Sequence, residues 1–141
     1  MNRRIFLDTS FIIAILSTSD VFHTQAVTQA RELSSSDEIW ITDAILFEVG
    51  NAFSKIDKTL ASGFIRNCTE TLTTRIVWTD EVQFKKALEK YTQSRDKNWS
   101  LTDCLSFLVM AEQELEIAYS SDHHFEQAGF QYTLKRGMPP H

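Results

Sequence analysis

Short apolar runs rich in β-formers alternate with longer segments of helical spacing along nearly the whole chain. The runs are Arg4–Leu7, Glu38–Ile41, Arg75–Trp78, Glu116–Tyr119 and Gln131–Leu134. Strands that alternate with helices predict βαβ units, and hence a mostly parallel sheet that is covered by helices on both faces. We therefore expect an α/β fold: a three-layer α/β/α sandwich with a central, mostly parallel sheet of about five strands.

The segments between these runs carry apolar residues at steps of three and four, which is typical of amphipathic helices. These residues are Ala26, Ala30 and Leu33; Ile45, Val49, Ala52, Phe53 and Ile56; Leu60, Phe64 and Ile65; and Phe84, Leu88 and Tyr91. A later segment, Leu101–Leu115, is apolar on nearly every side. A helix of that kind is expected to be buried and not to lie on the surface.

Length and composition predict a single domain. The chain has 141 residues, of which 43% are hydrophobic and 23% charged, the balance of an ordinary globular domain. Both prolines, Pro139 and Pro140, lie at the very end, so we expect one domain over residues 1–141 with a short tail from about residue 135. Two cysteines, Cys68 and Cys104, make neither a disulfide framework nor a zinc set, as in a reduced, cytoplasmic protein.

Export, membrane insertion and binding through bulk positive charge are not expected. Arg3 and Arg4 precede an apolar stretch, but Asp8 interrupts it and no small-residue cleavage site follows. No run approaches the roughly 20 apolar residues of a membrane span. The net charge of −5 is unlike that of domains that hold nucleic acid through bulk positive charge, but it does not exclude a nuclease, because bound cations reverse the field of an acidic site.

Two aspartates directly follow predicted strands. Asp8 comes after Arg4–Leu7, and Asp122 comes shortly after Glu116–Tyr119. In open parallel sheets, ligands bind beyond the carboxyl ends of the strands, near the point where the strand order reverses. Each aspartate also has a structural alternative, because aspartate is a favoured N-cap and a helix is predicted to follow each one.

Two further carboxylates belong to predicted helices. Glu48 lies at the edge of an apolar stripe, so its side chain either lines the seam between helix and sheet or extends out of that seam into water. Asp103 begins the most apolar helix, where it completes a capping box with Ser100. A carboxylate at the start of a buried helix nevertheless costs free energy unless a positive charge compensates it.

Together, the four carboxylates suit a magnesium site. Mg²⁺ prefers oxygen ligands, and four acids are enough for one ion or for two ions about 3.5–4 Å apart. Histidine and cysteine spacing does not suggest zinc, and neither a glycine-rich phosphate loop nor a Gly-x-Ser-x-Gly elbow is present. An aspartyl-phosphate phosphatase remains a weak alternative, because Ser10 occupies the position of the second aspartate that this chemistry expects.

Four segments resemble, in order and spacing, the motif regions of PIN-domain ribonucleases, and VapC-type toxins of bacterial toxin–antitoxin pairs in particular. The segments are FLDTSFIIAIL, TDAILFEVGNAF, WSLTDCLSFLVM and YSSDHHFEQAGF, which together extend from near Ile5 to Phe130. The resemblance implies that Asp8, Glu48, Asp103 and Asp122 bind Mg²⁺ or Mn²⁺ and activate water for hydrolysis of RNA. It also places supporting hydroxyls at Thr9, Ser10 and Ser120.

The resemblance further implies a homodimer, and a small antitoxin whose tail enters the site. Because the motifs use almost all of the chain, we expect a toxin and not a free-standing RNA-processing nuclease; a non-catalytic module with the same fold is the other alternative. Apolar residues near Lys55–Thr74 and Phe84–Tyr91 are expected either to pack in the core or to form a docking patch. The RNA target is open: transfer, ribosomal and messenger RNA all fit.

Some polar and aromatic residues have two interpretations. Six cations are candidates for phosphate contacts, although most such residues are ordinary surface charges: Lys55, Lys58, Arg95, Lys97, Lys135 and Arg136. His23, His123 and His124 are not assigned as metal ligands; a histidine beside Asp122 either orients that carboxylate or contacts RNA, or else is simply packed or solvated. Trp99 is expected to pack in the core, with base stacking as the alternative.

Overall fold

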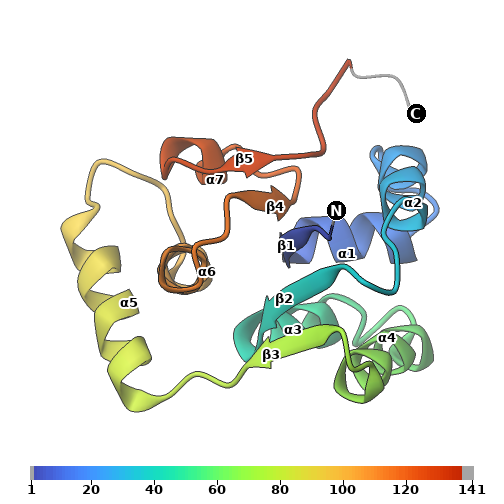
Figure 1. The fold of residues 1–141 in the computed structure, drawn as a ribbon, viewed down its shortest axis with the longest axis horizontal. Coiled ribbons are helices and arrows are strands. Elements are labelled where there is room, and N and C mark those ends of the chain that lie inside the picture. The colour runs from blue at the N-terminus through green and yellow to red at the C-terminus, as the bar shows by residue number, and fades with distance from the viewer. Residues whose placement is uncertain (1, 138–141) are drawn as a thin grey trace.

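Five parallel strands form one sheet at the centre of the protein, as the alternating sequence pattern predicts. The structure is a computed structural model that describes residues 2–137. The strands are β1 (Arg4–Leu7), β2 (Glu38–Thr42), β3 (Thr74–Val77), β4 (Ile117–Tyr119) and β5 (Gln131–Tyr132). Their order in the sheet is β3-β2-β1-β4-β5, and every pairing is parallel (Figure 1).

Helices connect the strands in sequence. They are α1 (Thr9–Leu16), α2 (His23–Arg31), α3 (Asp43–Ala52), α4 (Lys58–Glu70), α5 (Glu81–Gln93), α6 (Leu101–Glu112) and α7 (His124–Gln127). Side chains at the start of several helices accept hydrogen bonds from the free N–H groups of the first turn, as N-caps do. Asp8, Thr42, Asp57, Asp80 and Ser100 all cap a helix in this way.

The connections put helices on both faces of the sheet. The chain moves from β1 to β2 to β3 in one direction, then crosses back to β4 and β5 in the other. Because crossovers between parallel strands are right-handed, this reversal places α1–α4 on one face and α5–α7 on the other. Contacts of α1 with α2 and α3, and of α5 with α6, agree with this arrangement (Figure 1). The strand order reverses between β1 and β4, which is where such folds bind ligands.

Aromatic packing fixes the layers on either side of β1 and β4. Phe6 of β1 contacts Phe125 of α7, and Phe125 packs edge-on against Phe107 of α6 with ring centroids 5.1 Å apart. On the other side, Phe11 of α1 packs edge-on against Tyr119 of β4. These contacts hold α1, α6 and α7 against the two central strands, and so fix the positions of the segments that begin or precede them.

The predicted burial of the Leu101–Leu115 helix is confirmed. Six residues of α6 are buried, among them Cys104, Phe107 and Met110. Both cysteines are free and buried, and burial raises the pKa of the Cys68 thiol to about 11. No helix in residues 2–137 combines the length and apolar character that crossing a membrane requires.

Several predicted boundaries differ from the structure in detail. β3 ends at Val77, and Trp78, expected in that strand, is 64% exposed. β5 stops at Tyr132, although Leu134 is still buried. Ile56 follows α3 instead of continuing its apolar stripe, and it is exposed. The predicted tail from about residue 135 is described only to Gly137, and residues 138–141 lie outside the described part.

Candidate active site

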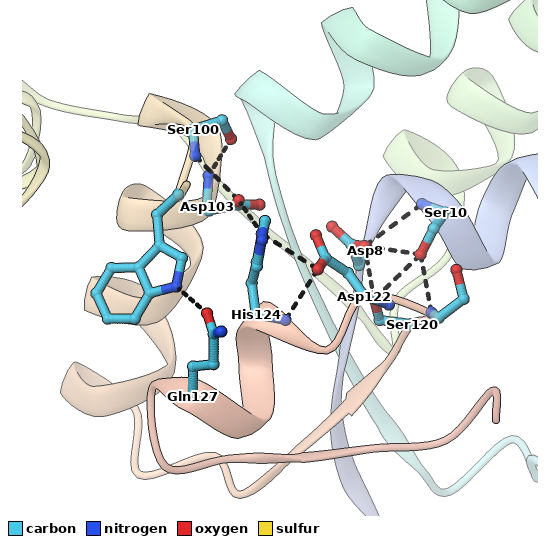
Figure 2. Close-up of polar contacts among 10 residues, drawn as sticks. Asp8, Ser10, Ser100, Asp103, Ser120, Asp122, His124 and Gln127 are labelled. Carbon is cyan, nitrogen blue, oxygen red and sulfur yellow. Dashed lines mark hydrogen bonds and ion pairs between the residues drawn. The ribbon is translucent and has the colours of Figure 1, made fainter. Parts of the chain in front are cut away.

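Asp8 is a nearly buried carboxylate at the carboxyl end of β1. Its backbone N–H donates to the Tyr119 carbonyl of β4, so the ladder between the two strands ends at this residue. The side chain is N-cap to α1, and its Oδ2 accepts hydrogen bonds from the Ser10 hydroxyl at 2.8 Å and from the Ser120 hydroxyl at 2.7 Å (Figure 2). The capping alternative for Asp8 is therefore correct, and it does not compete with a role in a site.

The environment of Asp8 opposes a negative charge. The residue is only 6% exposed, and burial, reinforced by the negative charges of Asp103 and Asp122, raises its pKa to about 6, even though the Ser120 and Ser10 hydroxyls act in the opposite direction. Within residues 2–137, no lysine or arginine forms an ion pair with any of these three aspartates. A buried carboxylate with acidic neighbours and no cationic partner is costly, and a cation would remove that cost.

Asp103 and Asp122 lie near Asp8, and their negative charges contribute to its raised pKa. Asp103 is the third residue of α6, where it forms the predicted capping box with Ser100, and Asp122 lies in the short loop between β4 and α7. The His124 Nδ1 lies 3.1 Å from Asp103 Oδ2 and 3.2 Å from Asp122 Oδ1 (Figure 2). We call Asp8, Asp103 and Asp122 the acidic cluster. Three segments that are distant in sequence thus place carboxylates at one point of the sheet edge.

Glu48 is connected to the site through a hydrogen bond with Thr9. It lies on α3, which packs against α1, and its Oε1 accepts a hydrogen bond from the Thr9 hydroxyl at the first residue of α1. The structure therefore brings Glu48 to the start of α1, one residue from Asp8, and holds it there through a threonine.

The serines predicted to support the site form a connected network. The Ser120 hydroxyl is fully buried; it donates to Asp8 and accepts the backbone N–H of Asp122 at 2.9 Å. The Ser10 hydroxyl lies 3.0 Å from that of Ser120 and accepts the backbone N–H of Ser121 at 3.0 Å. This network fixes the loop that carries Asp122 relative to Asp8 without using the second oxygen of the Asp8 carboxylate.

The donor set fits a divalent metal ion. All hydrogen bonds found for the Asp8 side chain in residues 2–137 reach Oδ2, which leaves Oδ1 available for another partner. Mg²⁺ and Mn²⁺ favour carboxylate oxygens, and a hard cation beside Asp8 would compensate its burial. The residues that would hold such an ion are Asp8, Asp103 and Asp122, with Glu48 positioned by Thr9 beside them.

Sequence reasoning missed Asp43, and it considered a histidine beside Asp122 but not the contact of His124 with Asp103. Asp43 follows β2 as Asp8 follows β1, but both of its oxygens accept hydrogen bonds from Thr79, so it ties the loop after β3 to α3. His124 contacts two of the predicted site carboxylates, and is neither simply packed nor solvated. The order of residues in the motif gave no signal for this contact, because it depends on how α7 docks against α6.

Other predicted residues take ordinary structural positions. Trp99 packs edge-on against Phe107, and its ring N–H donates to Gln127, which confirms the core-packing interpretation. His23 contacts the Ala14 carbonyl at 2.7 Å. Two of the six candidate cations, Arg95 and Lys97, line an open groove of about 750 Å³ that reaches Ser100, the N-cap of the helix that carries Asp103.

The sequence matches the PIN domain family over residues 5–131, a span that includes every residue of the site described above. The chain belongs to the PIN domain family. No curated protein matches its sequence significantly. The four motif segments identified from the sequence therefore correspond to a PIN domain that occupies most of the chain.

Solved structures of other proteins share this fold. VapC20 of Mycobacterium tuberculosis, a toxin that cleaves the sarcin-ricin loop, is similar with a TM-score of 0.80 at 23% identity, over 89% of this chain and 95% of that one. FitAcB from Neisseria gonorrhoeae has a TM-score of 0.64 at 14% identity, with 91% and 95% covered. VapBC-1 from nontypeable Haemophilus influenzae has a TM-score of 0.62 at 13% identity, with 92% and 96% covered. The five-stranded parallel sheet of this PIN domain is thus the fold of VapC-type toxins.

Proposed function

We propose that this PIN domain is an endoribonuclease that depends on Mg²⁺ or Mn²⁺ and that its catalytic and metal-binding residues are Asp8, Glu48, Asp103 and Asp122. The observation that carries the proposal is the buried Asp8 carboxylate, which has acidic neighbours, no lysine or arginine partner within residues 2–137, and one oxygen free of hydrogen bonds. Membership of the PIN family and the likeness to a ribonucleolytic toxin support RNA as the substrate.

In this proposal, serine and threonine residues of the protein hold the carboxylates in position. Ser10 and Ser120 fix one oxygen of Asp8, Ser100 fixes the backbone that carries Asp103, and Thr9 fixes Glu48. A divalent ion, when bound, lowers the pKa of water and neutralises charge on the phosphate in the transition state. The groove lined by Arg95 and Lys97 reaches Ser100, the N-cap of the helix that carries Asp103, which suits an RNA strand that approaches along α5 and α6.

Cleavage should require a divalent ion. Purified protein incubated with total RNA and with ribosomal RNA is expected to cut in Mg²⁺ or Mn²⁺ and to lose cutting in excess EDTA, because four carboxylates without a cation repel the substrate phosphate. Ribosomal RNA is the first substrate to test, since VapC20 cleaves the sarcin-ricin loop. Cleavage that is indifferent to EDTA would contradict the metal mechanism. Calorimetry that detects no specific Mn²⁺ binding would favour a non-catalytic module.

We further propose that the protein is the toxin of a toxin–antitoxin pair, that it acts in the cytoplasm as a single PIN domain, and that it forms a homodimer and binds a small antitoxin. Exposed apolar residues support the two protein partners. Phe47, Trp78 and Phe84 are at least half exposed around two shallow cavities of about 420 and 190 Å³, and Leu60 on α4 is partly exposed. A surface of this kind marks an interaction site. Sedimentation at the monomer mass at every concentration would contradict the homodimer.

Expression in a bacterial host should arrest growth. Sequencing of RNA ends after induction is expected to find cuts at a small number of structured sites, because a toxin of this family acts on a defined RNA. Coexpression of a protein that occupies the site would restore growth. Normal growth at a high level of soluble protein would instead favour a free-standing processing nuclease or a scaffold.

A further inference from the structure

His124 lies between two carboxylates of the acidic cluster. Its Nδ1 is 3.1 Å from Asp103 Oδ2 and 3.2 Å from Asp122 Oδ1, and its side chain is only 18% exposed (Figure 2). The orientation of the residue is fixed from two sides: its backbone N–H donates to Asp122 at 2.9 Å, and Phe125, the next residue, is fully buried in the core. A third, non-carboxylate donor is therefore held in place beside two proposed ligands of the metal ion.

His124 Nδ1 is spaced from each of the two carboxylate oxygens as neighbouring ligands of one ion are spaced. Ligand atoms that lie about 2.1 Å from an octahedral ion are about 3.0 Å apart when they are adjacent. The two distances from His124 Nδ1 are close to that value, so a cation held by either carboxylate oxygen could also contact this nitrogen. The tautomer of His124 decides what Nδ1 offers: an N–H at Nδ1 donates to the two carboxylates, whereas a ring with its proton on Nε2 presents a lone pair to a cation.

A second observation points to a cation here. The potential ligand atoms of Asp122, His123 and His124 all lie within 4.8 Å of one another. His123 is exposed, and its ring is tilted against that of His124 at a centroid distance of 4.8 Å. His124 is packed between Asp103 and Asp122. The exposed neighbour His123 therefore serves as the control residue.

We propose that His124 is a ligand of the divalent ion, through Nδ1, and that this nitrogen makes the site prefer Mn²⁺ to Mg²⁺. The inference rests on the proposed function and departs from the expectation that the histidines are not ligands. Mg²⁺ takes oxygen donors almost exclusively, whereas imidazole suits transition-metal ions. An oxygen set of Asp8, Asp103 and Asp122 alone would not discriminate strongly between the two ions; a set that includes imidazole nitrogen does.

Pulsed electron paramagnetic resonance of the Mn²⁺-loaded protein tests this ligand directly. The wild type should show modulation from a nitrogen nucleus bound to Mn²⁺, and labelling histidine with ¹⁵N should change it. His124→Gln should lose the modulation, and the matched control His123→Gln should keep it. In calorimetry, His124→Gln should lower the affinity for Mn²⁺ by about tenfold or more, with a smaller effect on Mg²⁺.

The possible outcomes separate the proposal that His124 is a ligand from the proposed function. Mn²⁺ binding without nitrogen modulation in the wild type would overturn the histidine ligand and leave the proposed function standing. Loss of the modulation in His123→Gln alone would also overturn it. If the wild type binds neither Mn²⁺ nor Mg²⁺, the proposed function itself fails. If His124→Gln does not fold, ¹⁵N labelling of the wild type still tests for a histidine nitrogen on Mn²⁺, and modulation that persists in His123→Gln excludes the neighbouring histidine.

Discussion

Asp8→Asn is expected to lower RNA cleavage by about a thousandfold or more while the protein stays folded. Asparagine has the shape of aspartate and still accepts the hydrogen bonds of Ser10 and Ser120, but it brings no negative charge to the cation. Its amide would also place an N–H₂ group where Asp8 Oδ1 is free. Initial rates of cleavage of one labelled RNA, measured with equal concentrations of folded protein, give the ratio.

Asp57→Asn is the matched control for this variant. Asp57 is N-cap to α4, as Asp8 is N-cap to α1, and its side chain likewise accepts a hydrogen bond from the first turn of its helix. Asparagine is an equally good cap, so Asp57→Asn should cleave at the wild-type rate. A folded Asp8→Asn protein with wild-type cleavage would show that Asp8 only caps α1 and has no role in the reaction.

The same substitution should stabilise the metal-free protein at neutral pH by about 3 kcal/mol. The pKa of Asp8 is raised from 3.8 to about 6 in the folded state, chiefly by burial. Between pH 3.8 and about pH 6, Asp8 therefore keeps its proton in the folded protein but has lost it in the unfolded chain. The free energy of unfolding of the wild type therefore falls as the pH rises through this window, and the loss is complete above about pH 6. Asp8→Asn has no such loss.

Urea denaturation of both proteins in EDTA, from about pH 4 to pH 7, measures this difference. The stabilities should be similar near pH 4 and should separate in favour of Asp8→Asn as the pH rises. Addition of Mn²⁺ at neutral pH should then raise the stability of the wild type and have little effect on the variant, because ligand binding stabilises the state that binds it. Stability curves that stay parallel across the pH range would mean that Asp8 is not held as an uncompensated buried acid.

The fold was predictable because the sequence patterns that indicate its strands and helices are local and repeated. The apolar run at Arg4–Leu7 and the helix at Leu101–Leu115 owe their burial to composition and periodicity, which any window of the sequence contains. The positions of Asp8 and Asp122 followed from a general rule of parallel sheets, since the carboxyl ends of β1 and β4 meet where the strand order reverses. The sequence alone therefore predicted that Asp8 and Asp122 lie near each other.

The finer geometry of the site was not predictable in the same way. That His124 reaches Asp103 depends on the angle at which the four residues of α7 dock on α6 through Phe125 and Phe107. That Glu48 bonds to Thr9 depends on the packing of α3 on α1. Likewise, the exposure of Trp78 follows from where β3 ends, and boundaries are the least regular part of a sequence pattern. Long-range side-chain contacts have no signature in local spacing.

The reversal of strand order also bears on when, during translation, the acidic cluster is assembled. Asp8 leaves the ribosome early, whereas Ser120, Asp122 and His124 belong to the segment around β4 and α7, which is made late. Until β4 pairs with β1, Asp8 lacks the Ser120 hydroxyl, and the carboxylates of Asp103 and Asp122 have no fixed relation to it. A nascent chain therefore carries no assembled acidic cluster until the late segment around β4 and α7 has folded.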